Sequence, residues 1–574
     1  MAFSEGPRGG FTPRAAELDG GVKRRRPNVA WAAFLTLVVA GPWLQPGYLF
    51  GTDWLGPRRF DWPNALSASV PLQAALALFS RVIGAEATGK LFVLAILFVA
   101  AFAAYAAVPA DGFFPRAAGA ALFVLNPFVF GRVHYGQLYL LAGYAVLPWA
   151  AVRLREVCAR PGWKNGVWFG VSLSVVGVFT LHLLLVACFL SAFVVSASFL
   201  WAPAKLVFLR HMAGALLAAA GTGAVLCAYW LVPFVLGRSP EATVIGSTGV
   251  GQLDAYAAVP DANLGLVPNL VGLYGFWAEN SGRFTSMKAF APIWPEVLVG
   301  LLVVVAIGAV VGLARKGGEL RPWVAGLVVA ATLGVVLEMG VSHPLTAGFV
   351  RWLDGALPLY RGMRDAGKWA ALTALVYSQL FGLGLGAIIA WIRRVKLPAV
   401  QSEWLVGAAM ALLIAMPLYY GNGLLFGMHG SVKPSDYPAG WYAADRVLTS
   451  DAHPGRTLFL PWHQYMSLTF VKNQNSVIGP AALTFFSVPV LVSSNAEVPG
   501  VAAPTDPDQV AVTSLVSEGA AGSWAGVLAS MNVKYVLLAR EVDWKGYEFL
   551  DRQAGLSKVA DFGTILLYRN SLMP

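Results

Sequence analysis

Long apolar runs separated by short polar segments fill the chain as far as Tyr420. A helix needs about 20 mostly apolar residues to cross a bilayer, so this pattern predicts a series of membrane-spanning helices. The run Val167–Trp201 is too long for one crossing, and we divide it near His182 into two helices joined by a tight turn. About eleven spans result, at roughly 29–44, 91–108, 117–130, 138–152, two within 167–201, 212–236, 296–314, 323–340, 369–391 and 404–420.

The pattern changes after Gly421, where short apolar runs alternate with helix-like stretches. The segments RTLFLPW, VKYVLLA and TILLYRN have the length and composition of strands, and Trp524–Met531 and Tyr547–Gln553 fit short helices. The Pro/Asp-rich stretch Pro499–Asp508 predicts a loop. This alternation predicts a small α/β domain. We therefore divide the chain into a basic tail (1–28), a transmembrane domain (29–420) and an extracytoplasmic α/β domain (421–574).

Composition supports this fold class, an α-helical polytopic membrane protein with a smaller C-terminal α/β domain. Of the 574 residues 57% are hydrophobic and only 12% are charged, far from the usage of soluble proteins. The net charge of +11 combines +13 for the residues up to Tyr420 with −2 for the rest, so the basic excess indicates topology and anionic lipid, not nucleic acid.

The positions of the basic residues predict the orientation of the chain. Short loops rich in Lys and Arg stay in the cytoplasm. The loops that fall on one side contain Arg116, Arg153, Arg155, Arg160, Lys164, Lys205, Arg210, Arg315, Lys316, Arg321, Arg393, Arg394 and Lys396, in addition to the tail with Lys23 and Arg24 to Arg26. We expect a multi-pass plasma-membrane protein with a cytoplasmic N-terminus and an outer C-terminal domain. The lack of Asn-x-Ser/Thr acceptors favours a prokaryotic source.

The first outer loop, Pro46–Asn64, contains the best candidate for chemistry. Asp53 and Asp61 lie there among aromatic residues suited to a membrane interface, and the next stretch, Ala65–Ile83, predicts a helix lying along that interface. An exposed carboxylate can act as a general base. The alternative for Asp53 is a helix cap or an ion pair with Arg58 or Arg59, and for Asp61 it is ordinary turn chemistry before Trp-Pro.

Four further stretches carry a family resemblance: Asn126–Trp149, Leu357–Trp369, Gly455–Tyr465 and the segment VKYVLLAREVDWKGYEFLDRQAGL near the end. With the acidic first loop and the soluble C-terminal domain, they resemble the GT-C class of membrane glycosyltransferases. The likeness is to arabinofuranosyltransferase-like and related large bacterial and archaeal membrane proteins. The resemblance implies transfer of a sugar from a polyprenyl-phosphate donor to a cell-envelope glycan or glycolipid on the outer face.

The resemblance also implies roles for individual residues. The acidic residue of the first outer loop corresponds to Asp53, which becomes the catalytic base. Asp61 is a candidate ligand either for a divalent cation such as Mg²⁺ or Mn²⁺ or for the acceptor. The phosphate that leaves the sugar carries negative charge, which nearby cations must stabilise. Spacings of three and four would place Arg361, Arg364 and Lys368 on one helical face as a phosphate site, unless these long side chains simply snorkel to the interface. Further candidates are Arg132 and His134 for phosphate, and Trp441, Trp462 and Tyr465 for stacking on sugars.

Other chemistry finds little support in the sequence. There is no Walker loop, HExxH motif or nucleophile elbow, and Cys158, Cys188 and Cys227 have no metal-binding spacing. The alternative function is a non-catalytic envelope scaffold, or a transporter or flippase of a lipid-linked saccharide. A transporter should have two similar halves or broken helices at mid-membrane, and the sequence has no convincing repeat.

Overall fold

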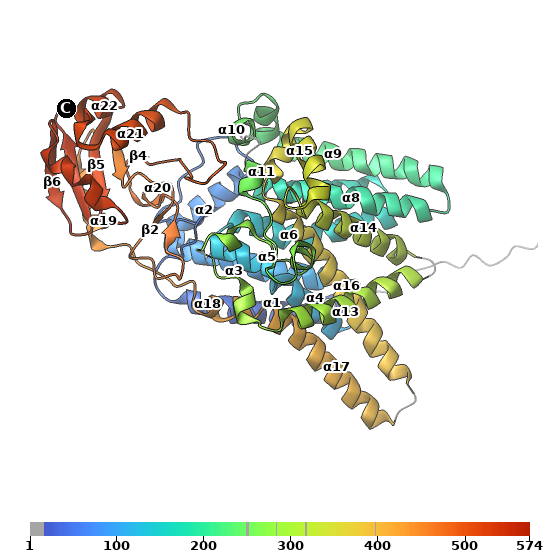
Figure 1. The fold of residues 1–574 in the computed structure, drawn as a ribbon. Helices are drawn as coiled ribbons and strands as arrows, with labels where there is room; N and C mark the ends of the chain where they lie inside the picture. The colour runs from blue at the N-terminus through green and yellow to red at the C-terminus, as the bar shows by residue number, and fades with distance from the viewer. Residues whose placement is uncertain (1–16, 248–251, 283, 316–317, 396–397) are drawn as a thin grey trace, which may run out of the picture.

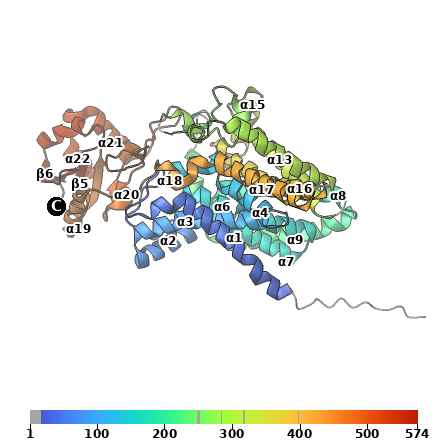
Figure 2. The same cartoon turned by 90° about the horizontal axis from the view of Figure 1, so that it is seen from below.

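The computed structural model describes residues 17–574 apart from 248–251, 283, 316–317 and 396–397. Most of residues 1–28, the predicted basic tail, lies outside this part, although helix α1 begins at Glu17 and continues into the first span. The molecule has two parts (Figure 1): a bundle of long helices, and a domain built on a β-sheet at one end of the bundle. The same division holds when the molecule is viewed from below (Figure 2).

Long helices form the bundle. They are α1 (Glu17–Ala40), α3 (Ala85–Ala107), α4 (Phe113–Val124), α5 (Pro127–Tyr135), α6 (Leu138–Ala159), α7 (Trp163–Phe179), α8 (Leu181–Trp201), α9 (Lys205–Val235), α13 (Trp294–Ala314), α14 (Leu320–Glu338), α16 (Ala370–Arg394) and α17 (Ala399–Tyr420). Shorter elements connect them: η1 (Gly41–Leu44), α2 (Val70–Ile83), α10 (Pro240–Ser247), α11 (Gln252–Ala255), α12 (Leu266–Val271), η2 (Trp277–Asn280), η3 (Met287–Phe290), α15 (Pro344–Ala356), η4 (Pro358–Met363) and η5 (Ala366–Trp369).

Eight helices in the described part of the chain are long and apolar enough to cross a membrane. A ninth span results if α4 and α5, which meet at 42°, count as one. The larger predicted number arises from α6 and α7, which are helices as expected but fail the same criteria. Helix α7 has only 17 residues, and α6 contains Arg153, Arg155 and Glu156 near its end. The predicted fold class, a polytopic helical protein with a C-terminal α/β domain, is confirmed.

Two local predictions about helices are also confirmed. Helix α7 ends at Phe179 and α8 begins at Leu181, so the long run divides next to His182 as predicted. The apolar stretch after the first loop forms the short helix α2, which begins at Val70.

Small residues let the helices approach closely. A Cβ atom added to Gly308 of α13 would lie 1.9 Å from the carbonyl oxygen of Leu380 in α16, and one added to Gly384 of α16 would lie 2.0 Å from that of Val304. In a membrane, such contacts stabilise helix pairs by van der Waals packing. Helix α16 is accordingly buried along much of its length at the centre of the bundle.

The C-terminal domain contains a five-stranded sheet in the order β4-β1-β5-β7-β6. The parallel strands are β4 (Val490–Leu491), β1 (Arg456–Leu460) and β5 (Val533–Ala539), and the antiparallel strands are β7 (Ile565–Asn570) and β6 (Leu556–Asp561). Every residue of β5 is buried because separate apolar clusters cover the two faces of the sheet. All three predicted strands are therefore confirmed.

The remaining elements of this domain cover the sheet and reach toward the bundle. They are η6 (Asn422–Leu424), α18 (Leu425–His429), α19 (Ala439–Ser450), β2 (Met466–Ser467), β3 (Val477–Ile478), α20 (Ala482–Phe485), α21 (Pro507–Glu518), η7 (Gly519–Ala521), α22 (Trp524–Ser530) and η8 (Trp544–Arg552). Strands β2 and β3 pair with each other in a separate small hairpin. This hairpin and the segment around Tyr437 both meet the first loop.

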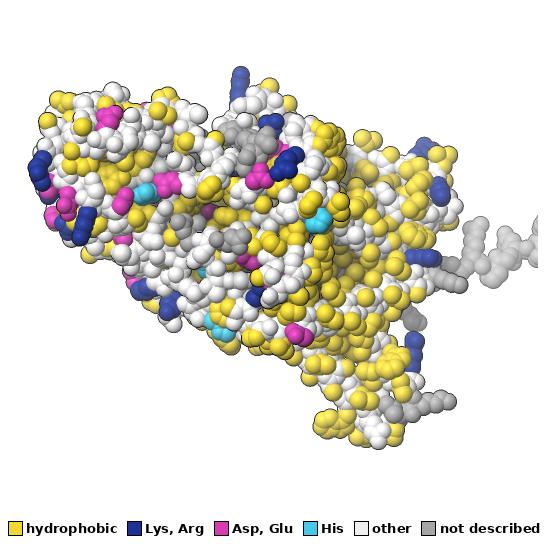
Figure 3. Space-filling view, in the orientation of Figure 1, with side chains coloured by type: hydrophobic (Ala, Val, Ile, Leu, Met, Phe, Trp, Pro, Cys, Tyr) yellow, Lys and Arg dark blue, Asp and Glu magenta, His cyan; other side chains and the backbone are white. Residues whose placement is uncertain are grey.

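The two parts differ in surface chemistry. Figure 3 shows hydrophobic side chains gathered over the helical bundle. On the C-terminal domain the same view shows several charged side chains and a histidine. Helices α9 and α17 expose large apolar residues such as Leu217, Trp404 and Leu412. Such a surface is stable when it faces lipid, so the bundle is that of a multi-pass membrane protein.

Candidate functional site

Asp53 lies at the tip of a tight turn. Backbone hydrogen bonds between Gly51 and Trp54 (2.8 and 3.0 Å) close the turn, leaving Thr52 and Asp53 at its tip. The Asp53 N–H donates to the carbonyl of Tyr135, the last residue of α5, at 2.7 Å. Gly51 passes so close to Gly136 that a Cβ atom on Gly51 would lie 2.7 Å from the Gly136 Cα. The turn is thus fastened to the bundle on one side.

The C-terminal domain holds the other side of the same turn. The carbonyl of Thr52 accepts from the N–H of Gly479 at 2.9 Å, and its hydroxyl accepts from Asn475 at 3.2 Å. The Tyr437 hydroxyl donates to the carbonyls of Leu55 and Gly56, each at 2.9 Å. The first loop therefore lies between the two parts of the molecule.

The carboxylate of Asp53 has one hydrogen-bond donor for each oxygen. Gln137 Nε2 donates to Oδ2 at 3.0 Å, and the Tyr465 hydroxyl donates to Oδ1 at 3.3 Å. Burial by the surrounding protein raises the pKa of Asp53 above its ordinary value, although these two hydrogen bonds oppose the shift. The residue is nevertheless exposed to solvent. An accessible carboxylate with a raised pKa can accept a proton from a bound hydroxyl.

Behind Gln137 lies a buried ion pair. Arg132 Nη1 donates to Gln137 Oε1 at 2.7 Å and to Asp365 Oδ2 at 2.5 Å. Both Arg132 and Asp365 are at most 5% exposed. Burial raises the pKa of Asp365, but the Arg132 guanidinium outweighs it and the pKa is lowered overall. Arg132 therefore orients Gln137, which in turn orients Asp53.

The basic residues of the RGMRDAGK segment have different partners. Arg361 Nε donates to the carbonyl of Asp354 at 3.2 Å, and Lys368 Nζ donates to that of Gly362 at 3.0 Å. Arg364 donates to Gln252 and stacks over the ring of Tyr256 at 5.1 Å. The prediction of one helical face is wrong, because the short helices η4 and η5 are separated at Asp365, whose extended backbone interrupts the helix.

Arg364 and Lys368 still belong to the surroundings of Asp53. Both interact electrostatically with His182, the second residue of α8, and Lys368 also with the Arg132–Asp365 pair. Tyr256 interacts with both Arg364 and Asp53. Arg364 is thus linked to the carboxylate through Tyr256, Lys368 lies by the Arg132–Asp365 pair, and Arg361 faces Asp354.

Two other predicted site residues lie elsewhere. His134 is 4% exposed and packs against the rings of Phe130 and Phe284. Asp61 is exposed and pairs with Arg59 at 3.1 Å. Within residues 17–574, leaving aside the nine undescribed ones, no three His, Cys, Asp or Glu side chains lie close enough together to hold a metal ion. Metal binding at Asp61 stays a prediction.

Of the aromatic residues expected to stack on sugars, only Tyr465 reaches the site. Trp441 is completely buried under the sheet, and Trp462 is 6% exposed with its indole N–H donating to Thr513. Sequence reasoning also missed Gln137 and the pairing of Asp365 with Arg132. An arginine buried in GRVHYGQ would need an anionic partner, because burying an unpaired charge is costly. No feature of the neighbouring sequence identifies Asp365 as that partner.

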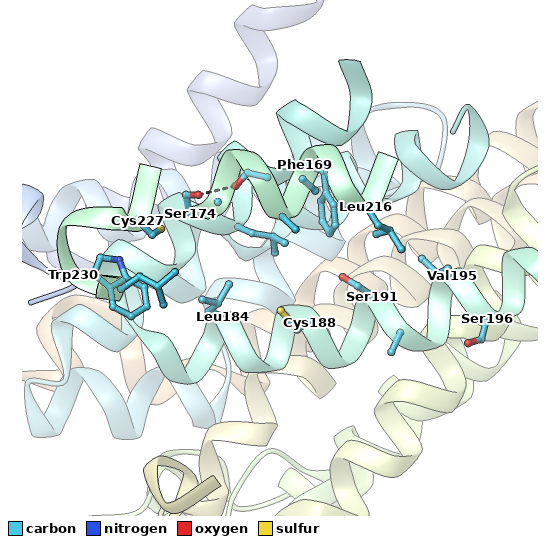
Figure 4. Close-up of a pocket in the computed structure, with 17 residues that line it drawn as sticks. Phe169, Ser174, Leu184, Cys188, Ser191, Val195, Ser196, Leu216, Cys227 and Trp230 are labelled. Carbon is cyan, nitrogen blue, oxygen red and sulfur yellow. Dashed lines mark hydrogen bonds between the residues drawn. The ribbon is translucent and has the colours of Figure 1, made fainter. Parts of the chain in front are cut away.

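An apolar groove of about 660 Å³ lies between α7, α8 and α9 (Figure 4). Small residues such as Gly170, Ala219 and Gly223 line this space, together with Cys188 and Ser191 of α8. Leu184, in the first turn of α8, marks one end, close to His182. A Cβ atom added to Gly362 would lie 3.7 Å from His182 Nε2, so this end of the groove lies beside the RGMRDAGK segment.

The fold has counterparts among solved structures. Two structures of the mycobacterial arabinofuranosyltransferase AftD, one of them a mutant, match with TM-scores of 0.59 and 0.58 at 15% identity. The chain therefore shares its fold with this arabinofuranosyltransferase. The matches cover 95% and 96% of this chain but only 41% and 40% of the AftD chains. The chain thus spans about two fifths of the length of AftD.

A weaker match is the archaeal oligosaccharyltransferase AglB from Archaeoglobus fulgidus, solved with an inhibitory peptide and a dolichol-phosphate. It has a TM-score of 0.43 at 13% identity and covers 96% of this chain and 74% of its own. No protein-family model and no curated protein sequence matches the chain. The likeness therefore concerns the fold, and the predicted resemblance to the GT-C class is confirmed at that level.

Proposed function

We propose that the chain is a membrane glycosyltransferase that moves a sugar from a polyprenyl-phosphate donor to a cell-envelope glycan or glycolipid on the outer face. The observation that carries this proposal is the solvent-exposed Asp53 carboxylate, oriented by Gln137 and Tyr465. Tyr256, which stacks against Arg364, interacts electrostatically with the same carboxylate. A base and a cationic phosphate site close together are the two elements that glycosyl transfer from a phosphate requires.

The proposed step is an inverting displacement. The acceptor hydroxyl gives its proton to Asp53 while its oxygen forms a bond to the anomeric carbon, and the bond from that carbon to the phosphate oxygen breaks. The polyprenyl phosphate leaves with the bonding electrons. Arg364 and Lys368 would stabilise its negative charge, Arg bidentately and Lys as a point charge. Arg132 is committed to Asp365 and Gln137, so we assign it to positioning and not to phosphate.

The groove between α7, α8 and α9 suits the polyprenyl chain of the donor. It is apolar, lies among membrane-spanning helices and ends near His182, beside the basic segment. A donor with its chain in the groove would present its phosphate toward Arg364 and Lys368. Binding along the chain would hold the reacting carbon in place, which lowers the entropic part of the barrier.

The decisive experiment compares the wild-type protein with Asp53→Asn in proteoliposomes. A panel of radiolabelled polyprenyl-phosphate sugars is the donor, and cell-envelope glycan fragments and glycolipids are the acceptors. We expect transfer by the wild type and a loss of at least 100-fold in Asp53→Asn, within the range that general bases contribute. Asp436→Asn, an exposed aspartate of the C-terminal domain, is the matched control and should keep full activity.

Two results would contradict the proposal. Transfer at the wild-type rate by Asp53→Asn would remove Asp53 as the base. Absence of transfer with every donor, together with movement of an intact lipid-linked saccharide across the vesicle membrane, would favour a flippase. Omitting Mg²⁺ and Mn²⁺ from the same assay tests the predicted cation.

A further inference from the structure

We propose that the C-terminal domain completes the active site by supplying Tyr465 as a positioning residue for Asp53. This inference rests on the proposed function. It gives Tyr465 a role that the similarity of fold does not imply. Its basis is the contact between the Tyr465 hydroxyl and Asp53 Oδ1 at 3.3 Å, made between residues 412 positions apart in the chain.

The contact is part of a built interface. Tyr465 directly precedes β2, and the β2–β3 hairpin also supplies Asn475 and Gly479 to the two polar groups of Thr52. Asn473, in the hairpin loop, donates to the carbonyl of Phe50 at 2.8 Å. Donors from one hairpin thus hold the Phe50 carbonyl and both the hydroxyl and the carbonyl of Thr52, which helps to fix the distance between the Tyr465 hydroxyl and the Asp53 carboxylate.

The two donors to the carboxylate come from different parts of the molecule. Gln137 belongs to the helical bundle and donates to Oδ2, whereas Tyr465 belongs to the C-terminal domain and donates to Oδ1. Burial raises the pKa of the Tyr465 phenol, and the neighbouring Asp53 raises it further, so the hydroxyl keeps its proton at physiological pH. It therefore acts as a fixed donor to the ionised base and does not take part in the proton transfer itself.

This arrangement has a measurable consequence for pH dependence. A hydrogen bond to an ionised carboxylate favours the charged form and lowers its pKa. Its removal should raise the pKa of Asp53, so that the base becomes protonated, and activity is lost, at a higher pH. Ordering of the carboxylate by the C-terminal domain would then be visible as a shift of the acid limb of the pH profile.

The test is the pH profile of kcat/KM for Tyr465→Phe, which keeps the ring and removes only the hydroxyl. We expect the acid limb to move up by about one to two pH units, from the typical strength of hydrogen bonds to charged groups. The matched control is Tyr535→Phe, which removes another Tyr–Asp hydrogen bond of the same domain, 2.7 Å to Asp451. Its acid limb should coincide with that of the wild type.

The outcomes separate this inference from the proposed function. If Asp53→Asn is inactive and the limb of Tyr465→Phe does not move, the base assignment stands and the role of Tyr465 is overturned. A merely structural role for Tyr465 would lower the yield of folded protein or the rate at every pH, and would leave the limb in place. Wild-type transfer by Asp53→Asn would overturn the proposed function first.

Discussion

The side-chain amide of Gln137 lies between Arg132 and Asp53, and these two partners determine which way it points. Arg132 donates to Oε1 at 2.7 Å, so the Nε2 group must face the carboxylate, to which it donates at 3.0 Å. A guanidinium only donates and a carboxylate only accepts, so the reverse orientation would lose both hydrogen bonds. The orientation of the candidate base is thus determined by a cation that does not touch it.

Gln137→Glu should weaken the base. One oxygen of the new carboxylate can accept from Arg132, and the other would face Asp53, where a like charge raises the pKa of Asp53 further. The pKa of Asp53 is already raised by burial, and the base must be ionised to act. We therefore expect the acid limb of kcat/KM to move to higher pH, by about one unit or more.

The control for this substitution is Gln553→Glu, at a glutamine in the C-terminal domain that donates to the Gly522 carbonyl at 2.7 Å. Its pH profile should match that of the wild type. An unchanged acid limb in Gln137→Glu would argue that Gln137 does not control Asp53.

Breaking the Arg132–Asp365 pair should destabilise the protein. In Arg132→Met the Asp365 carboxylate would be left buried without its partner, which typically costs about 3–5 kcal/mol. The double variant Arg132→Met/Asp365→Leu should recover much of this loss, since an apolar pair of similar volume is often as stable. Thermal unfolding in detergent, followed by intrinsic fluorescence, measures both effects.

Activity should not recover with stability in the double variant, because Gln137 has lost the donor that orients it. Arg351→Met is the matched control, since Arg351 forms an exposed pair with Asp254 and its loss should cost about 0–1 kcal/mol. Equal destabilisation by Arg132→Met and Arg351→Met would refute the structural role of the buried pair.

Asp445 should couple the first loop to the C-terminal domain. It is 4% exposed and accepts from Arg58 at 2.6 Å, from the Ser487 N–H at 2.8 Å and from the Ser487 hydroxyl at 3.1 Å. Asp445→Ala would remove these hydrogen bonds, each of which typically contributes about 1 kcal/mol to stability. We expect faster proteolysis between the bundle and the sheet domain, and a lower rate of transfer because Tyr465 would be less well placed.

Arg540–Asp561 is an ion pair of the same domain that lies on its surface, with side chains 31% and 45% exposed. Asp561→Ala should therefore leave the proteolysis pattern close to that of the wild type. If both alanine variants are digested alike, Asp445 does not join the two parts.

Filling the groove should weaken binding of the lipid donor. Gly223 of α9 lines the groove, and the nearest side-chain atom to an added Cβ would be Ser174 Oγ at 3.9 Å, so a leucine side chain can extend into the space without displacing backbone. Gly223→Leu should raise the KM for a long-chain polyprenyl donor about 10-fold or more and affect a short-chain analogue less. Gly214→Leu, at a position on the same helix with open space, is the control. An unchanged KM in Gly223→Leu would exclude the groove as the lipid site.

Local patterns in the sequence determined the elements and the class of the protein. Apolar runs of membrane length predicted the spans, the length of Val167–Trp201 predicted the break between α7 and α8, and β-branched runs predicted β1, β5 and β7. These features can be predicted because solvent, lipid and backbone geometry act on each segment separately. The loop that contains Asp53 could be identified as a candidate site in the same way, because it directly follows the first predicted span.

Only the tertiary structure decided what surrounds Asp53. Its partners Gln137 and Tyr465 lie 84 and 412 residues away, and Arg132 meets Asp365 across 233 residues. The spacing in RGMRDAGK predicted one helical face, but the capping of η5 by Asp365 and the attraction of Arg132 broke that helix. The sequence determines which polar groups are too costly to bury alone, whereas packing of distant segments determines which partners meet them.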